Sequence, residues 1–182
     1  MRVITGIAKK KPLKTLKESF LRPTTEKVKE AMFSIIQFKI NSTVVLDLFA
    51  GSGQLGIEAI SRGAKCCTFV DSSIQAHKVE LLNLKNTKLE KNAKVIISDA
   101  LTFLKNTKEK YDIIFLDPPF HSDLLIKSLQ LAEFKLTDKG IIICEHMKNV
   151  NLPNDFKNIS LQKQYQYGKI NLTFYENRQD IV

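Results

Sequence analysis

Residues 43–56 read TVVLDLFAGSGQLG, and they give the clearest indication of the fold. The apolar run, interrupted only by Asp47, is typical of a strand buried on both faces of a parallel sheet. Gly51, Gly53 and Gly56 then form a GxGxxG pattern between this strand and the helix expected after it. Glycines let the backbone turn tightly and bring its N–H groups against a ligand. The stretch predicts the first strand–turn–helix unit of a sheet that binds a nucleoside.

The same strand-then-helix pattern recurs along the chain. Strands are expected at 43–49, 65–70, 94–98, 111–116 and 140–144. Helices are expected at 24–38, capped by Thr24 or Thr25, and at 54–61, stopped by Gly63. Further helices are expected at 72–84 or longer, in a short stretch that runs through Leu104, and at about 123–134. The helix over 72–84 is expected to present Ile74, His77, Val79, Leu81 and Leu82 as its apolar side. Near the end, residues 161–167 and 169–176 alternate polar and apolar around Gly168, which predicts an antiparallel hairpin.

These elements predict an α/β fold, Rossmann-like, with a mostly parallel doubly wound sheet and a C-terminal antiparallel hairpin. The 182 residues suit one domain, 1–182, with a basic N-terminal arm (1–23) ahead of the Rossmann-like core (24–182). A hydrophobic content of 43% and a charged content of 26% exclude a disordered chain. No apolar run reaches the ~18–20 residues of a membrane span, and the N-terminus lacks the pattern of a secretory signal. Cys66, Cys67 and Cys144 lack metal or redox spacing, so we expect three core residues, no metal and a cytoplasmic protein.

The positive charge is concentrated at the N-terminus. Residues 1–29 hold nine Lys and Arg against two Asp and Glu, so they carry +7 of the net charge of +9. Lys9, Lys10 and Lys11 form its densest run. Such a patch attracts polyanions, of which nucleic acid is the commonest. The alternative is an arm that only makes the protein soluble.

Four of the predicted parallel strands end at or beside an aspartate: Asp47, Asp71, Asp99 and Asp117. In an open α/β sheet, ligands bind beyond the carboxyl ends of the strands. Asp71 follows Gly51 by twenty residues, where a carboxylate can bind two ribose hydroxyls. Aspartates also cap helices and start turns, which is the plainer interpretation of each one alone.

Asp47 distinguishes two cofactor classes. A dinucleotide would place its pyrophosphate over the glycine turn, where a carboxylate at the strand end repels it. S-adenosylmethionine has no phosphate and carries an amino group and a sulfonium. The sequence therefore favours S-adenosylmethionine over NAD.

The motif Asp117-Pro118-Pro119-Phe120 follows the fourth predicted strand. Two prolines fix the backbone and remove two N–H donors, so the carbonyls are left as acceptors. Asp117 and the Pro118 carbonyl can each accept one proton of an exocyclic amine, while Phe120 stacks on the base. This geometry directs the nitrogen lone pair toward a methyl donor. The alternative is a structural Pro-Pro turn, and His121, just after it, is expected to be a solvated loop residue.

With these motifs the chain resembles the RsmD family of class I S-adenosylmethionine-dependent methyltransferases, which methylate a guanine N2 in 16S ribosomal RNA. The resemblance rests on RVITG (2–6), LRPTTEKVKEAMF (21–33), DLFAGSGQLGIEAISRGA (47–64), SDALTFL (98–104), FLDPPF (115–120) and YGKINLTFYE (167–176). One departure is Lys10, which stands where the family commonly has a glycine.

The resemblance implies a role for each matching residue. Around the methionine part and ribose of the cofactor it places Asp47, Ala50, Gly51, Ser52, Gly53 and Asp71, and at the adenine Asp99 and Ala100. At the guanine amine it places Asp117, Pro118 and Phe120. It places Arg22 and Thr24, in the RPT signature, near the cofactor or the target, although Arg22 could equally bind a phosphate or pair with Glu26. With the basic arm, the expected substrate-binding residues are Arg2, Lys9, Lys10, Lys11, Arg22 and Thr24.

The leading hypothesis is therefore guanine-N2 methylation of ribosomal RNA, free or in the assembling small subunit, by a monomer. An adenine-N6 methyltransferase of DNA or RNA is the runner-up, since the same amine geometry suits it. A non-catalytic RNA-binding assembly factor is the third hypothesis, which the intact Asp117 and glycine turn disfavour.

Overall fold

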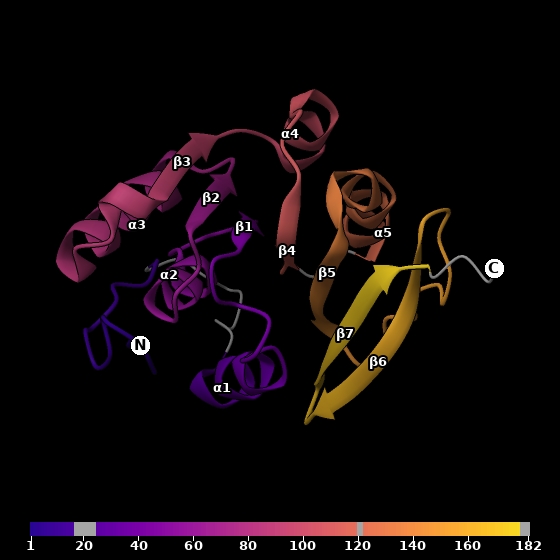
Figure 1. The fold of residues 1–182 in the computed structure, drawn as a ribbon, viewed down its shortest axis with the longest axis horizontal. Coiled ribbons are helices and arrows are strands. Elements are labelled where there is room, and N and C mark those ends of the chain that lie inside the picture. Colours follow the sequence, from indigo (N-terminus) through magenta and orange to yellow (C-terminus); the bar gives the residue numbers. More distant parts are fainter. Residues whose placement is uncertain (17–24, 120–121, 179–182) are drawn as a thin grey trace.

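A computed structural model of the chain describes residues 1–16, 25–119 and 122–178. Its centre is a seven-stranded sheet in the order β3-β2-β1-β4-β5-β7-β6 (Figure 1). The parallel strands are β1 (Val44–Leu48), β2 (Cys66–Asp71), β3 (Ala93–Ile97), β4 (Tyr111–Leu116) and β5 (Leu136–Met147). The strand order reverses where β4 pairs with β1. This confirms the doubly wound α/β prediction.

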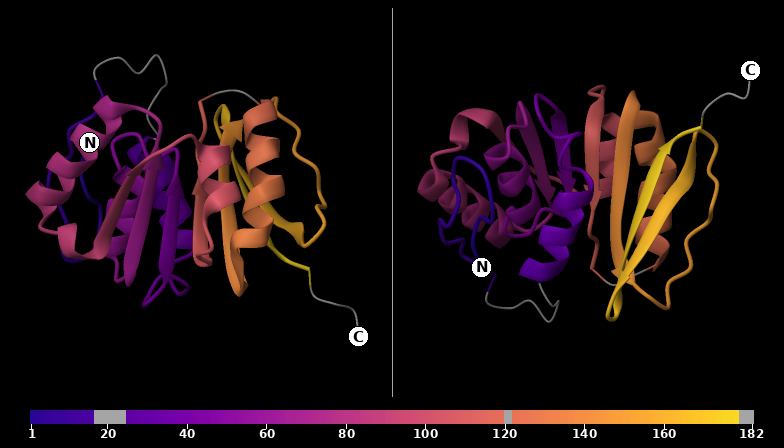
Figure 2. Two further views of the ribbon diagram at one scale, coloured as in Figure 1. Left: turned by 90° about the horizontal axis from the view of Figure 1, so that it is seen from above. Right: turned by 60° about the horizontal axis from the view of Figure 1, so that its bottom comes forward.

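The last two strands, β6 (Ile159–Tyr167) and β7 (Ile170–Asn177), form the predicted hairpin. Gly168 has a φ of 63°, which allows the tight turn between them. β7 pairs antiparallel with β5, so β6 becomes the outer strand. Figure 2 shows this hairpin at the opposite end of the sheet from α3.

Helices cover both faces of the sheet. They are α1 (Glu26–Ile35), α2 (Gln54–Ser61), α3 (Ile74–Thr87), α4 (Ala100–Asn106) and α5 (Ser122–Ala132), with short 3-10 turns η1 (Glu90–Asn92) and η2 (Glu133–Lys135). One core joins α1, α2, α3 and the arm to the sheet, and the other joins α4 and α5 to the opposite face (Figure 1). Cys67 and Cys144 lie in these cores as expected, whereas Cys66 is only half-buried. Burial on both faces explains the uninterrupted apolar strands.

Two predicted boundaries are wrong. The strand expected at 140–144 extends over all of β5, because Leu136 still pairs with β4 and residues 141–147 pair with β7. The first helix ends at Ile35 rather than at residue 38, since the Lys39 N–H donates to the Ile36 carbonyl in a turn. Phe38 is left 93% exposed. Thr25 is the N-cap, and its hydroxyl accepts from the Val28 N–H.

The expected apolar side of α3 is also wrong. Ile74 and Leu81 are exposed. The buried side consists instead of Ala76, Glu80, Asn83, Leu84 and Thr87. Three of these five are polar, so α3 packs on the molecule through groups that need partners.

The arm packs closely on α2. Glu58, fully buried in α2, accepts hydrogen bonds from the Ile4 and Thr5 N–H groups at 2.8 and 3.0 Å. Gly6 has a φ of 86°, and a Cβ there would lie 1.7 Å from the Ser61 carbonyl oxygen, so only glycine fits. Val3, Ala8 and Leu13 belong to the core shared with α2. Residues 1–16 are therefore built into the molecule rather than projecting from it.

Lys10 has a φ of 70°, the left-handed conformation that suits the glycine common in the family. Its N–H still donates to the Val3 carbonyl at 2.8 Å, so the turn is kept. We expect Lys10→Gly to stabilise the protein by about 0.5–1 kcal/mol, because relief of backbone strain outweighs the added freedom of the unfolded chain. Urea unfolding measures this. Lys9→Gly is the control, since Lys9 has no positive φ, and a stabilisation of equal size there would contradict the explanation.

Candidate active site

The carboxyl ends of three strands bring the predicted aspartates together. Leu48, the last residue of β1, lies opposite Val70 in β2 and Leu116 in β4. Asp71 is the next residue and the last of β2, and Asp117 is the residue after β4, so the two lie on either side of the end of β1. This is the point where the strand order reverses, the usual place for a ligand in such a sheet.

The glycine turn after β1 is held in an unusual backbone conformation. Phe49, Gly51 and Gly53 have φ angles of 79°, 56° and 75°. The Phe49 and Ala50 N–H groups both donate to the Val70 carbonyl, at 2.9 and 3.0 Å. A Cβ on Gly51 would meet only the Phe49 carbonyl oxygen, at 4.0 Å, so this side of the turn has room for a ligand. A non-glycine residue with positive φ, such as Phe49, is a form of strain that gathers at functional sites.

Asp47 lies under this turn and is 2% exposed. One of its oxygens accepts a hydrogen bond from the Gly56 N–H, in the first turn of α2, at 2.8 Å. Burial raises the pKa of Asp47 to about 7; the Gly56 hydrogen bond opposes that rise, and the charges of Asp117 and Asp71 add to it. At neutral pH a nearby cation would therefore stabilise its charged form.

Asp71 is fixed at the rim of the site. Its two oxygens accept from the Gly51 N–H at 2.9 Å and the Ser73 N–H at 2.8 Å. The side chain is half-buried, so it still faces outward. It thus ties the glycine turn to the end of β2.

Asp99 and Ala100 lie at the start of α4, beyond β3. Asp99 is exposed and caps the helix by accepting from the Thr102 N–H at 2.9 Å. Ala100 is buried. The helix-capping alternative therefore holds for Asp99, and the cap leaves it on the same edge of the sheet as Asp71.

The bend after β4 begins at the same edge. Asp117 is half-buried, Pro118 is buried and Pro119 is exposed. The charge of Asp117 contributes to the raised pKa of Asp47, so the two carboxyl groups lie in the same region of the site. Phe120 and His121 lie outside the described residues.

The basic candidates are not brought to this edge. Arg2 pairs with Glu26 at 3.3 Å, and the Lys11 ammonium donates to the Thr87 carbonyl at 3.1 Å. Thr87 is the last residue of α3, about 20 Å along that helix from the end near Asp71. Lys9 and Lys10 are exposed beside it. Arg22 and Thr24 lie outside the described residues.

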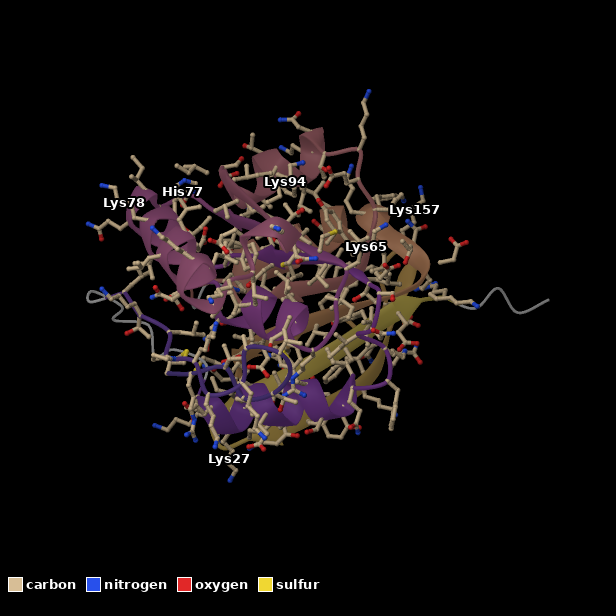
Figure 3. The ribbon with its side chains drawn as sticks, turned by 60° about the vertical axis from the view of Figure 1, so that its left-hand side comes forward. Lys27, Lys65, His77, Lys78, Lys94 and Lys157 are labelled. Carbon is tan, nitrogen blue, oxygen red and sulfur yellow. The ribbon has the colours of Figure 1, made fainter. Side chains whose placement is uncertain are left out.

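The lysines beyond the arm do not form one patch with it. Figure 3 shows Lys27 on α1 far from Lys78 on α3, and Lys29 is fully buried. Among residues 1–16, 25–119 and 122–178, no group of acidic, histidine or cysteine side chains has the arrangement of a metal site.

Sequence reasoning missed Asn83, which links the arm to the glycine turn. Its amide nitrogen donates to the carbonyls of Ser52 and Lys14, each at 2.9 Å. Its oxygen accepts from the Lys14 N–H at 2.8 Å. The available signal was the spacing of Glu80, Asn83 and Thr87, which places three polar residues on one side of a helix that has no apolar stripe.

The reversed strand order, the strained glycine turn and the converging carboxylates define a class, the S-adenosylmethionine-dependent methyltransferases with a Rossmann-like fold. Solved structures agree with this fold. Escherichia coli yhhF has a TM-score of 0.88 at 33% identity and covers 98% of both chains. A hypothetical protein of Thermus thermophilus has a TM-score of 0.84 at 27% identity and covers 97% of this chain and 99% of its own.

Sequence comparisons show the family. The model described as "Conserved hypothetical protein 95" matches residues 1–176. Ribosomal RNA small subunit methyltransferase D of Escherichia coli is 33% identical over 97% of this chain and 89% of its own length. The protein of the same name in Haemophilus influenzae is 34% identical over 97% and 94%. The chain belongs to this family, the RsmD family.

Proposed function

We propose that this protein transfers the methyl group of S-adenosylmethionine to the exocyclic N2 amine of a guanine in 16S ribosomal RNA. The observation that supports it most is the placement of Asp117 beside the end of β1, across from the glycine turn and Asp71. The relatives named small-subunit ribosomal RNA methyltransferases support the choice of RNA.

The residues at the glycine turn fit the methyl donor. Gly51 leaves one side of the turn open, and Asp71 presents a fixed carboxylate to accept from ribose hydroxyls. Asp47 is a buried acid whose charged form a cationic ligand would favour. Ala50, Ser52 and Gly53 complete the turn, and Asp99 and Ala100 border the space assigned to adenine. When bound, S-adenosylmethionine supplies an electrophilic methyl group.

The bend after β4 holds the acceptor. The Asp117 carboxylate and the Pro118 carbonyl each accept one proton of the amine, and Phe120 stacks on the guanine. Both protons lie in the plane of these acceptors, so the nitrogen lone pair is directed out of that plane. Asp117 also stands where it can take the proton that the nitrogen loses after methylation.

Lys9, Lys10 and Lys11 supply RNA affinity away from the reacting atoms, and Arg2, Arg22 and Thr24 also bind the RNA. We expect replacing Lys9, Lys10 and Lys11 with alanine to weaken RNA binding and to lower the slope of log K against log salt by about 2–3, since up to three phosphate contacts are lost. Filter binding at several salt concentrations measures this. The control replaces the exposed Lys105, Lys108 and Lys157. An unchanged slope in the arm variant would show that the arm serves only solubility.

No helix within the described part of the chain is long and apolar enough to cross a membrane. A monomer acting in the cytoplasm, on ribosomal RNA or the assembling small subunit, suits this function.

A transfer assay with labelled donor tests the proposal. We expect label in 16S RNA or small subunits, and none in duplex DNA. Methyl transfer only to DNA adenine would replace the proposal with the adenine-N6 alternative. Donor binding without any transfer would favour the non-catalytic assembly factor.

A further inference from the structure

A second buried acid lies beneath the glycine turn and is used by none of the steps above. Glu80, on α3, is 1% exposed, and both of its carboxyl oxygens are buried with no hydrogen-bond partner in the described part of the chain. Glu58, also buried, has four donors around it, from Ile4, Thr5, Lys29 and Arg62. Buried carboxyl groups nearly always have hydrogen-bond partners, as Glu58 does. The burial of Glu80 without such partners therefore needs an explanation.

The position of Glu80 connects it to the donor site. Its Cγ lies 3.5 Å from where a Cβ on Gly53 would be, so the side chain packs directly under the turn. Asn83, three residues further on the same side of α3, donates to the Ser52 carbonyl at the top of that turn. A change of charge at Glu80 would therefore change the electrostatic potential at the turn that we propose surrounds the donor.

Titratable groups from several elements surround Glu80. β1 contributes Asp47, and β2 contributes Asp71 and Cys67, a thiol whose pKa is raised by burial. α3 itself contributes His77, whose Nδ1 is buried and also lacks a partner among the described residues; Figure 3 shows this residue on α3. The arm meets this side of α3 through the main chain of Lys14 and, at the far end of the helix, through the Lys11 ammonium, which donates to the Thr87 carbonyl.

Burial raises the pKa of Glu80 to about 8, and the charges of Asp47 and Asp71 raise it further in the same direction. The carboxyl group is therefore mostly protonated at neutral pH in the empty protein. A cation seated on the turn acts in the opposite direction through its charge, since an opposite charge nearby favours the ionised form.

We propose that Glu80 is a positioning residue for the cationic methyl donor: donor binding expels the proton of Glu80 to solvent, and the carboxylate so formed strengthens the hold of the turn on the sulfonium-bearing donor. Protons and charge balance, because the neutral acid and the cationic donor give a carboxylate–cation complex and one released proton. The proposal rests on the proposed function only in taking S-adenosylmethionine as the donor.

The proposal fixes the sign of the pH dependence. The empty protein binds more protons than the complex, so the affinity for the donor rises with pH. It becomes constant above the pH at which Glu80 is already ionised in the empty protein. S-adenosylhomocysteine has a neutral sulfur, so its affinity should change less. The protein would thereby distinguish donor from product more sharply as the pH rises.

Titration calorimetry with S-adenosylmethionine, in buffers of different ionisation enthalpy, tests this without any RNA. At pH 7.5 we expect the wild-type protein to release about half a proton or more per donor, and its Kd to fall about fivefold to tenfold between pH 6.5 and 8.5. For S-adenosylhomocysteine the fall should be less than about twofold. The Glu80→Gln protein should lose most of the proton release, and its Kd for S-adenosylmethionine should be constant above pH 7.5. Glu90→Gln, a matched change at an exposed acid, should behave as the wild type.

The proposal would be overturned if the wild-type protein released no proton on binding the donor, or if the Glu80→Gln protein released as much as the wild type. Glu80→Leu guards against a folding defect, because removal of a buried acid should raise the Tm while donor binding weakens. A Glu80→Leu protein that binds the donor as tightly as the wild type would also overturn it. None of these results depends on the acceptor, so failure of the RNA assay and failure of this proposal are distinguishable.

Discussion

Replacing Asp117 with alanine is expected to abolish methyl transfer while the protein still binds its donor. In the proposed mechanism the carboxylate is one of two acceptors that orient the amine, and loss of such a group costs about 10³-fold in kcat. Asp71 and the glycine turn, the proposed donor site, are joined by a hydrogen bond that the change leaves in place. We therefore expect the Kd for S-adenosylmethionine to change by no more than a few-fold.

Single-turnover kinetics with labelled donor and small subunits measures the Asp117 effect, with calorimetry for the donor. Asp117→Asn keeps one acceptor oxygen and should retain more activity than the alanine variant. Asp123→Asn changes an exposed acid at the start of α5 and should be fully active. Normal turnover in Asp117→Ala would remove this residue from the reaction.

Replacing Glu58 with alanine is expected to give the largest loss of stability. Glu58 is fully buried and pairs with Lys29 at 3.4 Å and with Arg62 at 2.8 Å. It also holds the N–H groups of Ile4 and Thr5. Removing one side of a buried ion pair costs about 3–5 kcal/mol, because the remaining charge is left uncompensated. This is a large part of the ~5–15 kcal/mol that holds a typical domain folded.

The Glu58 effect should also depend on pH. Burial lowers the pKa of Lys29, and Glu58 opposes that shift, so the variant lowers it further. The unfolded chain then binds a proton that the native state lacks, and the free energy of unfolding of the variant rises with pH. Urea unfolding between pH 7 and 9.5 measures both effects. Glu30→Ala, at an exposed position of α1, is the control. If Glu58→Ala lowers the free energy of unfolding by less than about 1 kcal/mol, the arm is held by other contacts.

The strands and the rim of the site could be predicted because each depends on local pattern. Val44–Leu48 and Tyr111–Leu116 are buried on both faces, so their apolar runs reveal them directly. Asp71 and Asp117 follow such runs, and the parallel sheet brings their positions to one edge.

Features that depend on long-range partners were not predicted. The spacing of Glu80 and Asn83 marks one polar side of α3, but the glycine turn and the arm that bury this side lie far away in sequence, so the sequence does not show that it faces inward. The docking of the arm is likewise hidden in the sequence, where Lys9–Lys11 indicate only a basic patch that attracts polyanions. Only the structure shows that Glu58 fixes its backbone.

The central claim is that donor and acceptor meet between the glycine turn and the Asp117–Pro118 bend. A crystal structure with S-adenosylhomocysteine tests it most directly. We expect the ribose hydroxyls to bond to the Asp71 carboxylate and the sulfur to face Asp117. Ligand bound away from the turn, or a sulfur shielded from Asp117, would contradict the account.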